Sequence, residues 1–185
     1  VPVTPGTRQV TVGGAIASDI HGKNHHQVGS WANSVEAITI ATPANGVHRI
    51  TPTSDPDLFW ATAGGMGLTG IIIDATIRLS RIESSFLSVD TDRTPDLDST
   101  MALMDADDHL YDYSVAWIDL MATGASTGRS ILTRGHFATL DQLKPSQRAH
   151  PLRFTARSIA TAPRVVPPRL LNKVTVKAFN ELWYR

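Results

Sequence analysis

The stretch that most constrains the fold is residues 54–79, because it combines a helix start, a glycine cluster and a strand pattern. Ser54 followed by Asp57 predicts a helix N-cap with an acidic capping-box partner. Pro56 falls in the expected first turn, where its missing N–H removes no hydrogen bond. We therefore expect a short helix over residues 58–61 with a bulky apolar face.

The three glycines within residues 64–67 predict the end of that helix, since glycine adopts left-handed backbone and allows very close packing. We expect a positive φ at Gly65 or Gly67. Residues 71–79 form a β-branched run with alternating polar side chains from its middle onward, which is typical of a strand. A helix, a hinge and a strand in this order are compatible with many folds.

The composition of the 185 residues excludes several classes of function. Seventeen basic and seventeen acidic residues give a formal charge of zero, so nothing points to nucleic acid. The absence of cysteine excludes a disulfide framework, a thiolate metal site and a thiol nucleophile. No apolar run approaches the ~20 residues of a membrane span, and no signal peptide is recognisable. Because the sequence starts inside an extended pattern without Met, we expect it to be a piece of a longer protein.

Near the start of the chain, residues 9–12 read as a brief strand, and Gly13-Gly14 then begins a small-residue helix over residues 15–18. Free N–H groups at a helix start favour an anionic group, such as a phosphate. Close packing of the helix against another element would explain the two glycines equally well.

Residues 19–26 contain three histidines, His21, His25 and His26. A metal site is disfavoured, because a glycine interrupts the helix that would align the first two and no fourth ligand lies at a supporting interval. We interpret this segment as a solvated polar loop.

Residues 1–82 are expected to form an α+β unit with a mainly antiparallel sheet. Within it, residues 35–42 alternate as a strand, Asn45-Gly46 is a strong hairpin signal, and residues 47–51 return as the partner strand.

Residues 83–185 are expected to form a second α+β domain that is incomplete. Its predicted elements are a strand over 86–91, a helix over 95–104 with Leu97, Met101 and Met104 on one face, and antiparallel strands over 111–120 and 130–138. Residues 141–168 are basic and proline-rich without a clear period, so we expect a loop or lid there. Residues 170–183 fit a helix or a strand, and we expect apolar surface near the end of the chain to be uncovered.

Two segments resemble FAD-linked oxidoreductases of the vanillyl-alcohol oxidase type. Residues 57–61 (DLFWA), the glycine cluster and Gly70-Ile71-Ile72 match the family form DLFWALRGGGGNFGIVT, with departures at Met66, Leu68 and Thr69. Residues 1–26 are similar to VPVTPGTRxVTVGGAIAxDIHGKNHH, the pattern of the decaprenylphosphoryl-ribose oxidases. Ser18 stands where those enzymes often carry cysteine, and the match loosens after His26.

This resemblance implies that residues 1–82 are the second half of a PCMH-type FAD-binding domain and that residues 83–185 are part of a substrate-binding cap. It implies FAD as cofactor, with the pyrophosphate-gripping loop upstream of Val1, and oxidation of a polyprenyl-phosphate sugar as the oxidative half of a 2′-epimerisation. The resemblance further implies a partner reductase. It also implies peripheral association with the cytoplasmic or periplasmic face of the membrane. Another alditol or lactone oxidase, or a cofactor-free relative that serves as a binding module, remain alternatives.

The resemblance also implies site residues. Catalytic roles fall on His21, Lys23 and Trp117. The alternative for His21 is a loop histidine whose hydrogen bonds are satisfied by the backbone, for Lys23 a solvated side chain, and for Trp117 a place in the core of the cap. Val115 stands where the relatives often have serine. The cofactor contacts implied are Gly6, Thr11, Val12, Gly13, Gly14, Ser18, Asp19, Ile20, His21 and Ile72.

Overall fold

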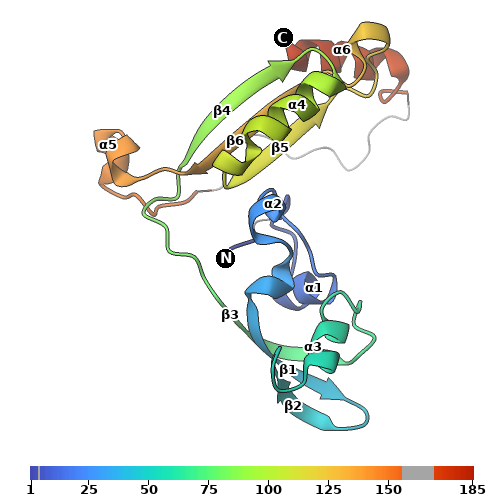
Figure 1. Ribbon diagram of the computed structural model, residues 1–185, viewed down its shortest axis with the longest axis vertical. Coiled ribbons are helices and arrows are strands. Elements are labelled where there is room, and N and C mark those ends of the chain that lie inside the picture. Colours follow the sequence, from blue (N-terminus) through green and yellow to red (C-terminus); the bar gives the residue numbers. More distant parts are fainter. Residues whose placement is uncertain (4, 156–168) are drawn as a thin grey trace. The chain divides into compact units, whose positions relative to one another are not determined.

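The computed structural model describes residues 1–3, 5–155 and 169–185 and divides the chain into two compact units, Val1–Arg81 and Ile82–Arg185 (Figure 1). In the part of the chain that the structure describes, each unit contains one three-stranded antiparallel sheet with helices. The predicted α+β class is therefore confirmed. The sequence placed the boundary after residue 82, and the PCMH and cap identities assigned to the two parts remain predictions.

The sheet of the first unit has the order β2-β1-β3 and is antiparallel throughout. The predicted hairpin is confirmed, with Gly46 at a positive φ of 64° and Ile40 of β1 paired with His48 of β2. The elements of this unit are α1 (Val12–Ala17), α2 (His25–Val28), the 3₁₀ helix η1 (Trp31–Ser34), β1 (Val35–Thr42), β2 (Gly46–Ile50), α3 (Pro56–Thr62) and β3 (Ile71–Ile77).

The core of the first unit lies between one face of this sheet and helices α1 and α3. Ile16 of α1 and Phe59 of α3 are fully buried against Ile38 and Ile40 of β1. On the opposite face Thr39 Oγ1 donates to Asp74 Oδ1 at 2.8 Å, and this face also exposes the apolar side chains of Val47 and Ile71. The alternation predicted for β3 thus separates a core face from an exposed face.

Two local predictions in this unit were wrong at helix starts. Residues 9–12 form no strand, because Thr11 acts as the N-cap of α1 and its Oγ1 accepts from Gly14 N. Helix α3 is capped by Asp55, whose Oδ1 accepts from Leu58 N. Ser54 instead accepts from Thr51 N in the preceding turn. Pro56 at the first helical position fixes the residue before it as the cap.

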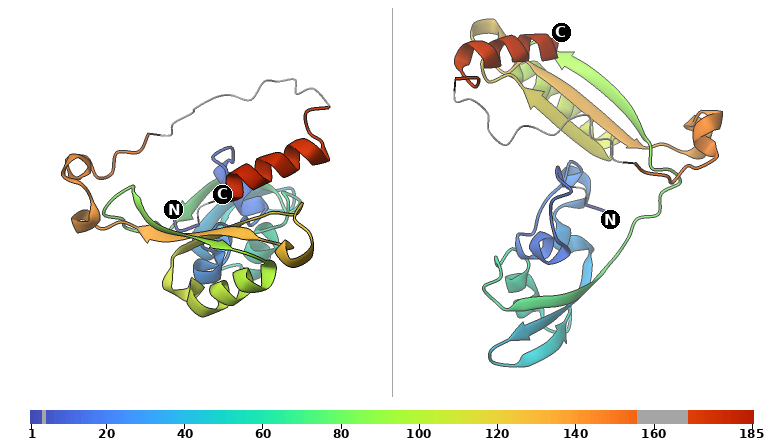
Figure 2. Two further views of the ribbon diagram at one scale, coloured as in Figure 1. Left: turned by 90° about the horizontal axis from the view of Figure 1, so that it is seen from above. Right: turned by 180° about the vertical axis from the view of Figure 1, so that it is seen from behind.

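In the second unit, α4 and α6 lie on opposite faces of the sheet, whose order is β4-β6-β5 (Figure 2). The pairing of β5 with β6 confirms the predicted antiparallel neighbours. The elements are β4 (Leu87–Thr94), α4 (Leu97–Asp107), η2 (Asp108–Leu110), β5 (Tyr113–Ile118), η3 (Gly124–Ser126), β6 (Ser130–Phe137), η4 (Leu140–Gln142), α5 (Pro145–Arg148) and α6 (Lys173–Tyr184).

Helix α4 is present as predicted, but its predicted apolar face was wrong. Leu97 and Met101 are exposed, and the buried residue is Thr100, whose hydroxyl lies 2.6 Å from that of Thr94 in β4. The sheet surface beneath this part of α4 is polar, with Thr94 beside buried Ser130. A threonine therefore fits the contact better than a leucine.

The region predicted as a lid, residues 141–168, is only partly described. It begins within η4 and contains the short helix α5, so its first part is not irregular as expected. Residues 156–168 lie outside the described residues, and the lid interpretation stays a prediction. Among the described helices, none combines the length and apolar character needed to cross a membrane.

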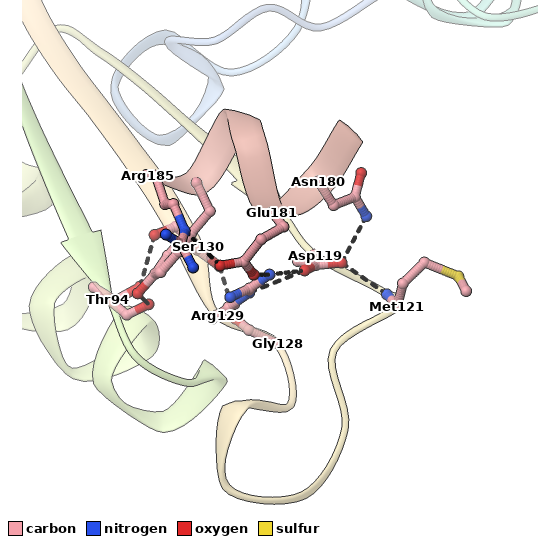
Figure 3. A network of polar contacts seen from close by, with 10 residues as sticks. Thr94, Asp119, Met121, Gly128, Arg129, Ser130, Asn180, Glu181 and Arg185 are labelled. Carbon is pink, nitrogen blue, oxygen red and sulfur yellow. Dashed lines mark hydrogen bonds and ion pairs between the residues drawn. The ribbon is translucent and has the colours of Figure 1, made fainter. Parts of the chain in front are cut away.

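Helix α6 resolves the ambiguity over residues 170–183, and a buried ionic network holds it on the sheet (Figure 3). Asp119, which follows β5, is 1% exposed, and its carboxylate accepts from Met121 N, Asn180 Nδ2 and Arg129. Arg129 also pairs with Glu181 at 2.8 Å. Burial favours a higher pKa for Asp119, but the hydrogen bonds from Met121 N, Asn180 and Arg129 outweigh it and lower the pKa.

This network predicts that the second unit loses stability in acid. The pKa of Asp119 is lower in the folded chain than its ordinary value of about 3.9. A carboxyl group with a lowered pKa stabilises the fold above its unfolded pKa, and that contribution is lost as the pH falls through the folded value. We expect the urea midpoint to drop between pH 5 and pH 3, and to drop less in Asp119→Asn. Equal losses in both proteins would place the acid sensitivity elsewhere.

Candidate functional site

The start of α1 is open to solvent. Thr11 and Val12 are exposed, and Gly13 and Gly14 are half-exposed. No described atom lies within 4 Å of the position that a Cβ would take at Gly13, and at Gly14 the nearest atom is the Oγ1 of the capping Thr11, at 3.0 Å. Tight packing against another element therefore does not explain the glycine pair. Backbone N–H groups without side-chain cover fit an anionic group such as a cofactor phosphate.

The end of α1 is joined to the glycine cluster of residues 64–67. Ile16 O accepts from Gly64 N at 3.0 Å, and Ala17 O accepts from Met66 N at 2.8 Å. Ser18 Oγ lies 3.7 Å from Met66 Sδ. The two segments that carry the family resemblance are far apart in sequence, yet they form one local structure.

The turn after α1 is fixed to η1. Asp19 has a positive φ of 41°, and its Oδ1 accepts from Ala32 N at 2.8 Å. Ile20 O accepts from Trp31 N at 2.9 Å, and His21 forms an isolated β-bridge with Ser30. This anchoring by η1 was not anticipated, because contacts between a turn and a 3₁₀ helix leave no periodic signal in the sequence.

His21 and Lys23 are both exposed on this anchored turn. The ring of His21 lies edge-on to that of His25, with 5.7 Å between ring centroids. The prediction of a solvated loop was wrong in part, because Asn24 is buried and donates to Pro2 O, and residues from His25 onward form α2. Over the described residues, no group of three or more side chains is placed to hold a metal ion.

The remaining predicted site residues belong to other segments of the chain. Gly6 is exposed near the start of the chain, and Ile72 of β3 is half-buried against the core of the first unit. Trp117 belongs to β5 in the second unit, where it pairs with Ile131 and is half-buried on the sheet face that carries α6. Val115 is on the same face and is 38% exposed.

Comparison with curated proteins gives a match along the whole chain. The chain is 48% identical over 187 aligned residues to the decaprenylphosphoryl-beta-D-ribose oxidase of Mycolicibacterium smegmatis. The alignment covers 100% of this chain and 41% of that protein. The chain is a relative of this oxidase. The resemblance inferred from residues 1–26 and 57–72 is thereby confirmed.

Two further curated proteins are similar to this chain. A Streptomyces coelicolor protein described as an uncharacterized protein in the mprA 5′ region is 39% identical over 95% of the chain and 47% of its own length. An uncharacterized oxidoreductase from the fasciation locus of Rhodococcoides fascians is 31% identical over 45% of the chain and 19% of its own length. The chain thus spans less than half the length of these relatives, and no family model matches it.

Two glycines at the junction with α1 are expected to be required for different reasons. Gly67 has a φ of 78°, which confirms the expected positive φ, and a Cβ there costs about 1 kcal/mol. At Gly65 the φ is not positive, but a Cβ would lie 2.1 Å from Ala61 O, so the end of α3 would have to shift. We expect Gly65→Ala to lower the free energy of unfolding by about 2 kcal/mol or more. Urea denaturation measures both losses.

The matched control is Gly6→Ala, because Gly6 is exposed and has no atom near its Cβ position. We expect its free energy of unfolding to stay within about 0.5 kcal/mol of that of the parent protein. A Gly65→Ala protein as stable as Gly6→Ala would show that the close approach to Ala61 O is not required.

Proposed function

We propose that the protein to which this chain belongs oxidises the 2′-hydroxyl of decaprenylphosphoryl-β-D-ribose to the 2′-ketone with FAD as cofactor. The observation that carries this proposal is the 48% identity along the whole chain to an oxidase of that name. The joined segments around α1 and the glycine cluster supply a second argument, because they are the segments that resemble FAD-linked oxidoreductases.

The residues at the start of α1 are suited to hold part of the cofactor. The exposed first turn at Thr11, Val12, Gly13 and Gly14 offers backbone N–H groups to an anionic group. The turn that follows α1 would supply further contacts to the cofactor, from Ser18, Asp19 and Ile20. The carboxylate of Asp19 already accepts a hydrogen bond from Ala32 N. When bound, FAD accepts the hydride that leaves the alcohol carbon.

His21 and Lys23 are proposed to act on the substrate. As the carbon–hydrogen bond breaks and the hydride departs, the hydroxyl loses its proton to the imidazole of His21, and the C–O single bond becomes a carbonyl. The ammonium of Lys23 would hold the phosphate of the substrate, since an ammonium donates strong hydrogen bonds to a phosphate and Lys23 is exposed. Trp117 is proposed to take part in the reaction on the strength of the resemblance alone.

The ketone product requires a second reaction to complete an epimerisation. We therefore propose a partner reductase that returns a hydride to the opposite face of the same carbon. The polyprenyl chain of the substrate would bring the enzyme to the face of a membrane.

The experiment uses the full-length protein that contains this chain. We expect it to show the visible absorbance of bound flavin, and we expect decaprenylphosphoryl-ribose to bleach that absorbance under anaerobic conditions. A colourless protein would favour a cofactor-free binding module. Bleaching by alditols or lactones, without bleaching by the lipid-linked ribose, would contradict the proposed substrate while leaving the flavin chemistry in place.

A further inference from the structure

The turn that follows α1 alternates between exposed and buried residues. His21, Lys23 and His25 are exposed, whereas Gly22 and Asn24 between them are buried. Buried residues therefore hold the backbone of the turn, and the three side chains with polar chemistry extend from it. The proposed reaction uses His21 and Lys23 but gives no role to His25.

The backbone beside His25 is fixed by Asn24. An asparagine at the N-cap of a helix usually accepts a hydrogen bond from the first turn through its side-chain oxygen. Asn24 caps α2 but makes no such bond, since its side chain is buried and its Nδ2 donates to Pro2 O. Val3, the next residue, is 1% exposed and belongs to the core of the first unit. The start of α2 is therefore tied to that core.

The ring of His25 is fixed as well. Its backbone N donates to Gly22 O at 3.2 Å, and its Nδ1 lies 3.2 Å from the same oxygen. A carbonyl oxygen only accepts, so Nδ1 carries the hydrogen of this bond. On the other side, His25 O accepts from Gly29 N at 2.9 Å, and Val28 packs against the core. The backbone of the turn thus sets the orientation of the His25 ring.

This fixed ring contacts the ring of His21. The two centroids lie 5.7 Å apart and the ring planes meet at 73°, an edge-to-face arrangement that is favourable for aromatic rings. The backbone of His21 is held by its β-bridge to Ser30, so the freedom left to His21 is rotation of its exposed side chain. A fixed ring beside that side chain reduces the number of rotamers that it can adopt.

We propose that His25 is a positioning residue that holds the imidazole of His21 in the orientation in which it accepts the hydroxyl proton. This inference rests on the proposed function, in which His21 is the proton acceptor. A base accepts a proton only when its lone pair points at that proton, so a side chain that rotates freely is out of reach for much of the time. His25 acts on the reaction through His21 and does not itself contact the substrate.

The test compares variants of the full-length protein by rapid anaerobic mixing with decaprenylphosphoryl-ribose. We expect His25→Ala to bleach the flavin about 10-fold more slowly at saturating substrate, with the flavin still bound and the half-saturating substrate concentration unchanged. His25→Phe keeps an aromatic ring beside His21 and is expected to recover most of the parent rate. His25→Asn keeps a donor for Gly22 O without the ring and is expected to be as slow as His25→Ala.

The double variant His21→Ala/His25→Ala distinguishes positioning from an independent role. Because His25 acts through His21, the double variant is expected to bleach at the rate of His21→Ala alone. His26→Ala is the matched control, since the exposed ring of His26 also lies edge-on to that of His25, with centroids 6.1 Å apart. It is expected to bleach at the parent rate. A double variant slower than His21→Ala, or a His25→Ala protein at the parent rate, would overturn the proposal.

A measurement without substrate separates this proposal from the proposed function. The ring protons of His21 lie beside the ring of His25, so His25→Ala is expected to move the ¹H–¹³C NMR signals of the His21 ring, and His25→Phe to move them less. Signals that stay in place would mean that the rings are not in contact, and the positioning role would fall. A parent protein that is colourless, or that lipid-linked ribose does not bleach, contradicts the proposed function instead. The His21 signals then still decide whether His25 orients that ring.

Discussion

Replacing His21 or Lys23 by alanine is expected to slow the reduction of bound flavin about 100-fold while leaving the flavin bound. This is the range that general acid–base catalysis usually contributes. His21 is the candidate to accept the hydroxyl proton, and an imidazole can do so at neutral pH. Lys23 is the candidate to hold an anionic group, and the effect of its charge grows once water is excluded from the site.

The structure explains why flavin binding should survive these substitutions. Both side chains are exposed, and the turn that carries them is held through backbone contacts, between Ile20 O and Trp31 N and between His21 and Ser30. An alanine at either position keeps those contacts. Rapid-mixing measurement of flavin bleaching by substrate gives the rate, and the visible spectrum gives the bound cofactor.

His26→Ala is the control for this prediction, because His26 is an exposed histidine three residues after Lys23 and has no assigned role in the reaction. It is expected to bleach at the parent rate. If His21→Ala and Lys23→Ala also bleach at that rate, the turn is scaffold and the catalytic groups lie in another part of the protein.

Replacing Asp119 by alanine is expected to lower the free energy of unfolding by about 3 kcal/mol. The carboxylate is 1% exposed and is bound by Met121 N, Asn180 and Arg129. Its removal leaves the guanidinium of Arg129, itself largely buried, with Glu181 as its remaining ionic partner. Removing one member of a buried ion pair is costly, because the other charge stays desolvated.

Urea denaturation followed by circular dichroism measures this loss, and Asp112→Ala is the control because Asp112 is an exposed carboxylate close by in sequence. We expect the control to change the free energy by no more than about 0.5 kcal/mol. An Asp119→Ala protein that matches the control would mean that the network contributes no net stability and that α6 is held by its remaining contacts.

Several elements could be predicted because their signals are local. The hairpin at Asn45-Gly46 depends on two residues that adopt a turn conformation, and the hinge at Gly67 depends on a positive φ that glycine readily supplies. The resemblance in residues 1–26 and 57–72 was also readable, since it depends on the identity and spacing of residues alone. The existence and type of most helices and strands followed from such signals.

Tertiary structure decided which surfaces these elements use. Leu97 and Met101 looked like the buried side of α4, yet Thr100 is buried because the facing strand presents Thr94. The polar side of α6 faces the sheet because it binds Asp119 and Arg129, which the β5–β6 connection brings together. Local patterns set backbone conformation within a few residues. The choice of buried face depends on the chemistry of a partner surface that is distant in sequence, and no pattern within a single helix records it.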